Sequence, residues 1–525
     1  MVCPRRCGSP NNSPTIAENN RNQWLILLTV MVGTFLGAMD QTVVSLAVPK
    51  IMLDFNILTS DAAWIATAYI LANAVFVPVW GKLGDTIGRK KVYIWGFSIF
   101  IVGSILAGLS WDLGSMILFR IIQAIASSAD YPTAMAIIAV NFSNGKERAQ
   151  ALGIWSSSFA AAIVFGPLIG GPLIDLFGWR SVFLINLPIG LIGIAMAHTF
   201  IPESVSDKKS VSFDWYGAIT LGIALALLVF GLDRAYDWGW TSLPIVLCFA
   251  GSGMFLYVFY LIDSRHPEPI IDFKFFKIPA FVLTIINNFM IFMCMMGGMF
   301  LIPIFCQTFL GLSATETGIL FIPMAFCMMR AAPIGATSLV GKIQPRYVIA
   351  LSTLVAGIGI YLFTGLDVRS GPLDIIIPIS IMALGMGFGM SQRTSIIAAV
   401  VPTGEIGSAS AVLALVRNVA GAFGIAIFST LLTNSIENNM LALSVHSVVN
   451  VHTPAVMQVA SALMYLDAQI LAYHTIFTVA GLILIVAAGL ALLIEVKETV
   501  EGKEIMLCRN DFLTKKNRVK NNRKI

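Results

Sequence analysis

The stretch "GKLGDTIGRKKV", residues 81–92, lies between two apolar runs of about 20 residues each, the length that an α-helix needs to cross the hydrocarbon core of a bilayer. The three glycines of the stretch permit a tight turn, and Asp85 can interact favourably with a helix N-terminus. The basic residues at its end hold a short loop in the cytoplasm. The stretch therefore predicts a cytoplasmic connection between two membrane-spanning helices.

Apolar runs of this kind recur along the whole chain. Of its 525 residues, 57% are hydrophobic and 12% are charged, whereas soluble domains contain about 25% charged residues. We expect an all-α polytopic membrane protein with fourteen transmembrane helices. The predicted spans are 24–48, 61–80, 92–110, 113–139, 150–173, 181–201, 214–232, 243–262, 279–304, 314–336, 347–365, 373–399, 407–432 and 472–495.

The basic residues orient these spans, because short loops rich in Lys and Arg stay in the cytoplasm. With the N-terminus inside, thirteen basic residues lie in cytoplasmic loops: Lys82, Arg89, Lys90, Lys91, Lys146, Arg148, Lys208, Lys209, Arg265, Lys274, Lys277, Lys342 and Arg346. Four lie in external loops: Lys50, Arg180, Arg234 and Arg369. Both tails are therefore predicted to be cytoplasmic, and the basic C-terminal tail indicates contact with anionic lipid rather than with nucleic acid.

The sequence carries no motif of an enzyme. It has no GxxxxGK[ST] phosphate loop, no GxSxG and no HExxH, and its five histidines lack metal-ligand spacing. We expect no cofactor and no metal site. If the protein pumps a solute, the energy does not come from its own hydrolysis of ATP.

The loop at 81–92 matches, position by position, the signature loop of the major facilitator superfamily, which the chain resembles. In that family Asp85 and Arg89 would latch the two halves of a transporter in its outward-facing state. The implied conformational latch comprises Gly81, Gly84, Asp85, Gly88 and Arg89.

Further motifs resemble one branch of that family, the fourteen-span drug:proton antiporters of the EmrB/QacA type. They are "MDQTVVSLAVP" from Met39, "GWRSVFLINLPIG" from Gly178 and "VLALVRNVAGAFGIA" from Val412. "RIIQAIASSADYP" resembles the fourth-helix motif of the superfamily as a whole, through Arg120, Gln123 and Pro132. "FGPLIGGPL" resembles the antiporter helix motif through Gly166, Pro167, Gly170 and Gly171. Asp130 departs from the family, which has an apolar residue there. A second copy of the signature loop, "SLVGKIQPR", lacks its Asp.

The resemblance implies a major facilitator fold of two six-helix bundles with two inserted helices. We expect a cytoplasmic tail at 1–22, bundles at 23–201 and 279–495, a linker with the inserted helices at 202–278, and a basic tail at 496–525. A central cavity would bind substrate near the membrane midplane and open alternately to each side. The implied cavity residues are Asp40, Gln123, Asp130, Asn287, Asn288 and Arg393.

Asp40 lies about 24 Å along its span from the inner surface, and Arg120 about 10 Å along its span from the outer one. In a core about 30 Å thick the two residues are nearly level. A carboxylate at the centre of a span costs about 2.5 to 3.5 kcal/mol, so a chain that keeps one usually uses it. We predict that Asp40, Arg120 and Asp130 couple transport to protons. The alternative is that Asp40 is a packing residue bonded to a hydroxyl such as that of Thr42.

Asp130 lies ten positions past Arg120, which on a continuous helix is about 80° round the axis. We hypothesise that Asp130 pairs with Arg393 of the second half, closing the cytoplasmic side in the outward-facing state. The alternative is that Asp130 is a second protonation or cation site while Arg393 extends toward the inner headgroups.

These features predict a proton-coupled antiporter that exports amphipathic small molecules, with cations favoured by the two carboxylates. One alternative is an exporter dedicated to one natural product or metabolite. Another is a membrane receptor or membrane-embedded enzyme. The expected location is the inner or plasma membrane. The expected partners are the substrate, protons and lipid, with a periplasmic adaptor protein if the cell has an outer membrane.

Overall fold

The computed structural model describes residues 16–142, 145–203, 214–267, 269–337, 344–401, 406–446, 454–495, 498–500 and 503–505. Several predictions concern segments outside these residues. They are the tail before residue 16, most of the second signature-loop copy, and the basic tail after residue 505.

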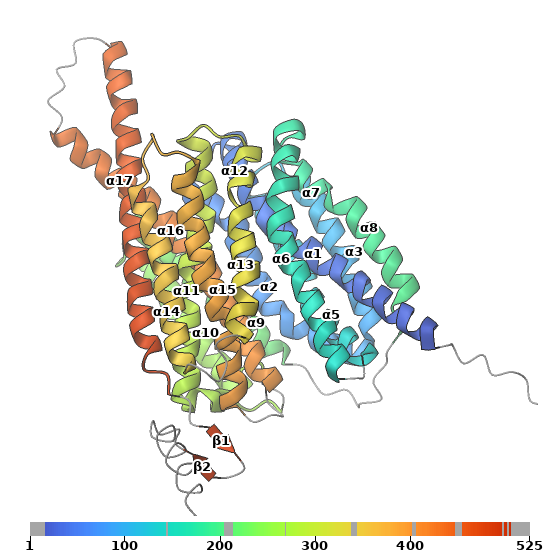
Figure 1. The fold of residues 1–525 in the computed structure, drawn as a ribbon. Coiled ribbons are helices and arrows are strands. Elements are labelled where there is room, and N and C mark those ends of the chain that lie inside the picture. The colour runs from blue at the N-terminus through green and yellow to red at the C-terminus, as the bar shows by residue number, and fades with distance from the viewer. Residues whose placement is uncertain are drawn as a thin grey trace, which may run out of the picture.

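The first bundle runs from α1 to α8 and occupies one side of the molecule, blue to green in Figure 1. Its helices are α1 (Ile16–Phe55), α2 (Thr59–Ile87), α3 (Arg89–Gly108), α4 (Leu113–Ser127), α5 (Asp130–Asn141), α6 (Gly145–Phe177), α7 (Ser181–Leu184) and α8 (Asn186–Phe200). Two helices follow, α9 (Trp215–Trp238) and α10 (Leu243–Asp263), and then the short 3-10 helix η1 (Phe273–Lys277).

The second bundle runs from α11 to α17 and occupies the other side, yellow-green to red in Figure 1. Its elements are α11 (Pro279–Thr308), α12 (Ala314–Leu320), α13 (Ile322–Thr337), α14 (Pro345–Leu362), the 3-10 helix η2 (Phe363–Gly365), α15 (Pro372–Val400), α16 (Ile406–His446) and α17 (Pro454–Ala491). Two short antiparallel strands follow, β1 (Glu498–Val500) and β2 (Lys503–Ile505).

Prolines explain three interruptions in these helices. A proline lacks the N–H that would bond the carbonyl four residues earlier, and its ring clashes with that carbonyl. Pro132, Pro188 and Pro323 each follow a helix that ends three to five residues before them, namely α4, α7 and α12. The pairs α4–α5, α7–α8 and α12–α13 are therefore single passes with a break.

Eleven helices of the described chain are long and apolar enough to cross a membrane. The other three predicted spans, 113–139, 150–173 and 314–336, correspond to α4–α5, to α6 and to α12–α13. Two of these are broken near a proline. In α6 the apolar segment is shorter and covers Phe165–Phe177. The all-α membrane architecture is confirmed, and the count of fourteen stays a prediction.

Each bundle has its own core of buried apolar side chains, one formed mainly by α1 and α3–α8 and the other by α11–α17. The inserted helix α9 packs against both bundles. Near its end Asp233 accepts hydrogen bonds from Trp64 Nε1 of α2 at 2.8 Å and from Thr430 Oγ1 of α16 at 2.7 Å. The inserted helix α9 therefore covers the junction of the bundles on one side, and α10 packs against α9.

Candidate functional site

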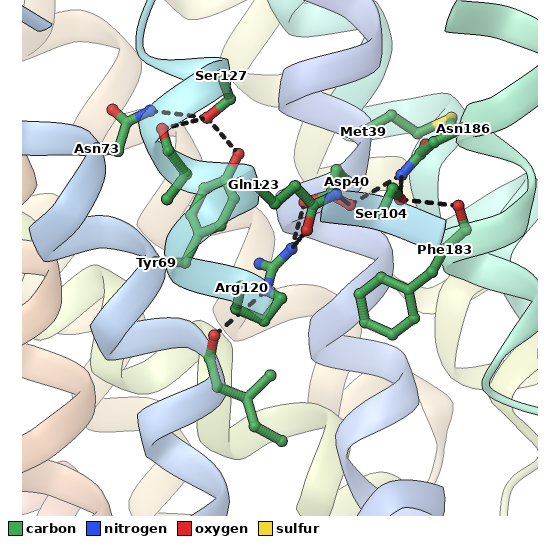
Figure 2. A network of polar contacts seen from close by, with 12 residues as sticks. Met39, Asp40, Tyr69, Asn73, Ser104, Arg120, Gln123, Ser127, Phe183 and Asn186 are labelled. Atoms are coloured by element: carbon green, nitrogen blue, oxygen red, sulfur yellow. Dashed lines mark hydrogen bonds and ion pairs between the residues drawn. The ribbon is translucent and has the colours of Figure 1, made fainter. Parts of the chain in front are cut away.

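Asp40 lies within α1 and is 1% exposed. Its carboxylate is the centre of a hydrogen-bonded group in the first bundle (Figure 2). Oδ2 accepts a hydrogen bond from Arg120 Nη1 at 2.6 Å, and Oδ1 accepts one from Gln123 Nε2 at 2.9 Å and one from Asn186 Nδ2 at 3.0 Å. The predicted proximity of Asp40 and Arg120 is confirmed. A bond between Asp40 and Thr42 is not formed, because Thr42 Oγ1 donates to the carbonyl of Met39.

Arg120 is held on several sides by α4 and its neighbours. Its Nη1 also donates to Gln123 Oε1 at 2.6 Å, and its Nε donates to the carbonyl of Ile65 at 3.4 Å. The guanidinium carbon lies 4.0 Å from the centre of the Tyr69 ring and 5.8 Å from that of Phe183. A cation over aromatic faces is stabilised by the negative potential of the rings. The guanidinium is therefore fixed in place beside the carboxylate.

Asn186 and Ser104 complete this group and were not predicted as site residues. Asn186 Nδ2 donates to Ser104 Oγ at 2.9 Å, and Ser104 Oγ donates to the carbonyl of Phe183 at 2.8 Å. Asn186 is the first residue of α8, directly after the break before Pro188. The sequence feature that could have identified Asn186 is its position as a polar residue inside an apolar span. We call Asp40, Ser104, Arg120, Gln123 and Asn186 the Asp40 network.

The Asp40 network contains an ion pair whose carboxylate is satisfied by further hydrogen bonds. All five side chains are buried. A buried ion pair is stable when further hydrogen bonds satisfy both partners, and removing one partner leaves an uncompensated charge. Protonation of Asp40 would remove the charge that Arg120 neutralises. It would therefore change the hydrogen bonds of the Asp40 network.

Asp130 does not join the Asp40 network. Its Oδ2 accepts a hydrogen bond from Thr34 Oγ1 of α1 at 2.7 Å, and Thr34 Oγ1 accepts one from Trp155 Nε1 of α6 at 2.8 Å. Oδ1 is buried without a hydrogen-bond partner among the described residues, beside a small cavity of about 20 Å³ that Gly33 and Tyr93 also line. The side chain thus points between α1 and α3, into the first bundle.

Arg393 lies in the second bundle and is 1% exposed. Its Nε donates to Asn287 Oδ1 at 2.8 Å and its Nη2 to Thr353 Oγ1 at 3.0 Å, while Nη1 has no hydrogen-bond partner in the described part of the chain. A side chain at Gly389 would contact the guanidinium nitrogens. Asn288 is also buried, and no described residue forms a hydrogen bond with its Nδ2. These three predicted cavity residues lie inside the bundle.

The predicted pair of Asp130 and Arg393 is not formed in this structure. Asp130 bonds to Thr34, and Arg393 bonds to Asn287 and Thr353, so each side chain turns into its own bundle. The prediction counted ten residues along one continuous helix. The break between α4 and α5 falls within that count, and Asp130 bonds to Thr34 of α1.

The implied latch is described only in part. Gly88 joins α2 to α3 with φ +106°, a conformation that strains any residue with a side chain. Arg89 Nη1 donates to the carbonyl of Ala136 of α5 at 3.1 Å. Gly84 is buried near Thr133 of α5. The structure does not describe the surroundings of Gly81 or the side chain of Asp85, so the latch stays a prediction.

The implied antiporter motif of α6 contacts helices of both bundles. A side chain at Gly166 or Gly170 would overlap Thr42 or Val43 of α1. On another face of α6, a Cβ at Gly171 would lie 2.5 Å from Thr315 Cα of α12. The glycines therefore allow α6 to approach both α1 and α12 closely.

Asp175, at the end of α6, bonds the start of α12. Its carboxylate accepts hydrogen bonds from the backbone N–H of Ala314 at 3.2 Å and of Thr315 at 2.9 Å, and from Thr315 Oγ1 at 2.5 Å. Nearby, Gln307 Nε2 of α11 donates to the carbonyl of Leu46 of α1 at 3.0 Å. These bonds join the bundles at their predicted outer ends.

Polar side chains that were not predicted lie where the bundles meet nearer the middle. Asn418 Nδ2 of α16 donates to Asn73 Oδ1 of α2 across a long 3.5 Å contact. Asn73 Nδ2 donates to Ser127 Oγ at 2.9 Å, and Tyr69 OH donates to the same oxygen at 2.7 Å. Beside Asn418, Arg417 lies 5.7 Å from the centre of the Phe292 ring.

Comparison with known proteins agrees with this architecture. The Major Facilitator Superfamily profile matches residues 30–425. The chain is 32% identical over 429 residues to the multidrug transporter protein MdtP of Bacillus subtilis (strain 168), covering 81% of this chain and 78% of that protein. It is 30% identical over 414 residues to the tetracenomycin C resistance and export protein of Streptomyces glaucescens, covering 79% and 76%.

A solved structure shares the fold. It is that of a bacterial homolog of the human lysosomal transporter Spinster, in an inward-facing and unoccupied conformation. The TM-score is 0.65 and the sequence identity 17%, with 91% of this chain and 99% of that chain covered. At this identity the likeness concerns the fold alone.

Proposed function

Because the chain belongs to the Major Facilitator Superfamily, we propose that it exports amphipathic small molecules in exchange for protons, by alternating access between its two bundles. The observation that carries this proposal is the Asp40 network, a buried carboxylate with one fixed cation and two amide donors. Intramembrane carboxylates of this kind mark proton pathways in transporters. Relatives named as multidrug transporters support export of varied small molecules.

The proposed cycle links the proton to the position of the bundles. A proton that reaches Asp40 from outside neutralises the carboxylate and weakens its bond to Arg120. Because the network joins α1, α3, α4 and α8, its rearrangement shifts these helices relative to one another. Release of the proton to the cytoplasm restores the ion pair. Substrate leaves in the state that is open to the outside.

The energy of one proton is sufficient for export. Entry down a potential of about 100 mV and half a pH unit releases about 3 kcal/mol, which sustains a substrate gradient of about 150-fold. The proposed location is the cell membrane with both termini in the cytoplasm, which the distribution of Lys and Arg supports.

A second candidate is an exporter dedicated to one compound. The likeness to a protein named for tetracenomycin C resistance and export supports it. The two candidates share the proton step and differ in breadth. A transport screen across unrelated amphipathic compounds separates them, because a dedicated exporter moves one chemical class only.

The proposal is tested with purified protein in sealed vesicles that carry a preloaded dye and an imposed pH gradient. We expect dye to move against its own gradient when protons flow the opposite way, and a protonophore to abolish this movement. Movement that persists with the protonophore, or that requires added ATP, would refute proton exchange.

A further inference from the structure

The charges inside the two bundles are not balanced in the same way. The charge of Asp40 is neutralised by Arg120, and Asp130 points into the first bundle. In the second bundle Arg393 and Arg417 carry two positive charges, and neither forms an ion pair with a carboxylate in the described part of the chain. Within the described residues, the second bundle therefore has positive charge in the membrane that no carboxylate neutralises.

Arg417 differs from Arg393 because it lies where the bundles meet. It is partly buried, beside Phe292 of its own bundle. Tyr131 of α5, in the first bundle, is within electrostatic range of its guanidinium and is 42% exposed. The adjacent Asn418 bonds to Asn73 of α2. Arg417 thus lies among α2, α5, α11 and α16, two helices from each bundle.

The depth of this position suits a binding site. Arg417 lies about 16 Å along α16 from its first residue, and Tyr131 lies about 15 Å along α5 from its last. Both helix ends are on the predicted cytoplasmic side. In a hydrocarbon core about 30 Å thick, these residues lie near the midplane, which is where transporters with two repeats bind substrate.

A guanidinium without a carboxylate is unfavourable at this depth. The ring of Phe292 offers a cation–π contact, which offsets part of the desolvation. A guanidinium also presents a planar set of donors that fits the two oxygens of a carboxylate. An anionic group that enters between the bundles would supply the missing charge.

We propose that Arg417 binds an anionic group, of the carboxylate or sulfonate class, on the exported substrate, and that Tyr131, Asn73 and Asn418 lie around the same site. The inference rests on the proposed export function and specifies its substrate. It replaces the expected preference for cations, because Asp40 and Asp130 direct their carboxylates into the first bundle.

The test uses the purified full-length protein and dyes that share a xanthene scaffold but differ in charge, fluorescein as the anion and rhodamine 123 as the cation. Binding is measured by thermal stabilisation and transport in sealed vesicles. We expect fluorescein to bind wild-type protein about tenfold more tightly than rhodamine 123. Arg417→Gln should weaken fluorescein binding about tenfold and leave rhodamine 123 binding unchanged.

Two variants sharpen this test. Arg417→Lys keeps the charge but loses the planar donors, so we expect fluorescein binding to weaken only two- to fivefold. Arg330→Gln removes an equal charge from an exposed position on α13 and should change neither dye. If Arg417→Gln fails to fold, the Lys variant carries the test, and fluorescein binding equal to wild type in it would count against the planar recognition proposed here.

Other outcomes overturn the inference without touching the export proposal. Proton-driven transport of rhodamine 123 with no binding of fluorescein would leave a proton-coupled exporter that does not select anions. Fluorescein binding that survives Arg417→Gln would place anion recognition elsewhere. In a further outcome, neither dye moves with a proton gradient but fluorescein still binds through Arg417. That result would reject the transport mechanism alone.

Discussion

The two bundles hold buried charge in different ways. In the first, Asp40 pairs with Arg120, and two amides complete the shell of the carboxylate. In the second, Arg393 is equally buried, but its partners are the neutral side chains of Asn287 and Thr353. No described carboxylate of α11 to α17 is buried. Within the described residues, a buried carboxylate is therefore found in the first bundle and not in the second, and the proposed proton exchange is located in the first.

The largest effect is expected from breaking the pair in the first bundle. Asp40→Asn leaves the Arg120 guanidinium buried without its counter-charge, which should lower the free energy of unfolding by about 3 to 5 kcal/mol. The double variant Asp40→Asn with Arg120→Gln should regain most of this stability, because it removes both charges. Thermal unfolding of the purified proteins measures both. Equal stability of the single variant and wild type would show that the pair is not a buried charge pair in solution.

A smaller effect is expected from two matched asparagines, one in each bundle. Asn186→Ala and Asn287→Ala each remove a buried amide that bonds a charged group, so each should cost about 1 to 3 kcal/mol of stability. Only Asn186→Ala should also reduce proton-driven accumulation, by about tenfold, because only Asn186 contacts Asp40. Vesicle transport at several pH gradients makes the comparison. An equal loss of proton dependence in both variants would contradict the claim that proton coupling depends on the first bundle only.

The smallest effect is expected from Arg393→Met. The change removes a buried cation that has no carboxylate partner among the described residues, and the loss of two hydrogen bonds offsets the relief of desolvation. We expect the free energy of unfolding to change by about 1 kcal/mol or less. The dependence of transport on the proton gradient should stay the same. A loss of several kcal/mol in thermal unfolding would show that Arg393 has a charged partner outside the described residues.

The sequence predicted the membrane architecture and the centre of the site for identifiable reasons. Apolar runs and basic loops report spans directly. Depth along a helix is a simple count, so Asp40 and Arg120 could be placed level with each other, and their ion pair of 2.6 Å confirms it. Gln123 follows Arg120 by three residues and shares its helix face.

The remaining contacts depend on helix rotation and on breaks, which a residue count does not give. Asn186 of α8 reaches Asp40, and Ser104 of α3 reaches Asn186, through the rotation of α8 and α3 about their axes. Asp130 was expected to face the other bundle, but it bonds to Thr34 of its own bundle, and the count along the span crossed the break before Pro132. The prediction assumed that a buried Arg pairs with a buried carboxylate, and this assumption could not show that Arg393 has neutral partners.

The most direct test of the central claim compares two transport modes in Asp40→Asn. Exchange of labelled for unlabelled substrate across a vesicle membrane needs the bundles to alternate but needs no net proton movement. Accumulation driven by a pH gradient needs the bundles to alternate and also needs net proton movement. The account predicts that Asp40→Asn retains exchange and loses accumulation. Accumulation at the wild-type level in this variant would contradict the role of Asp40 in proton coupling.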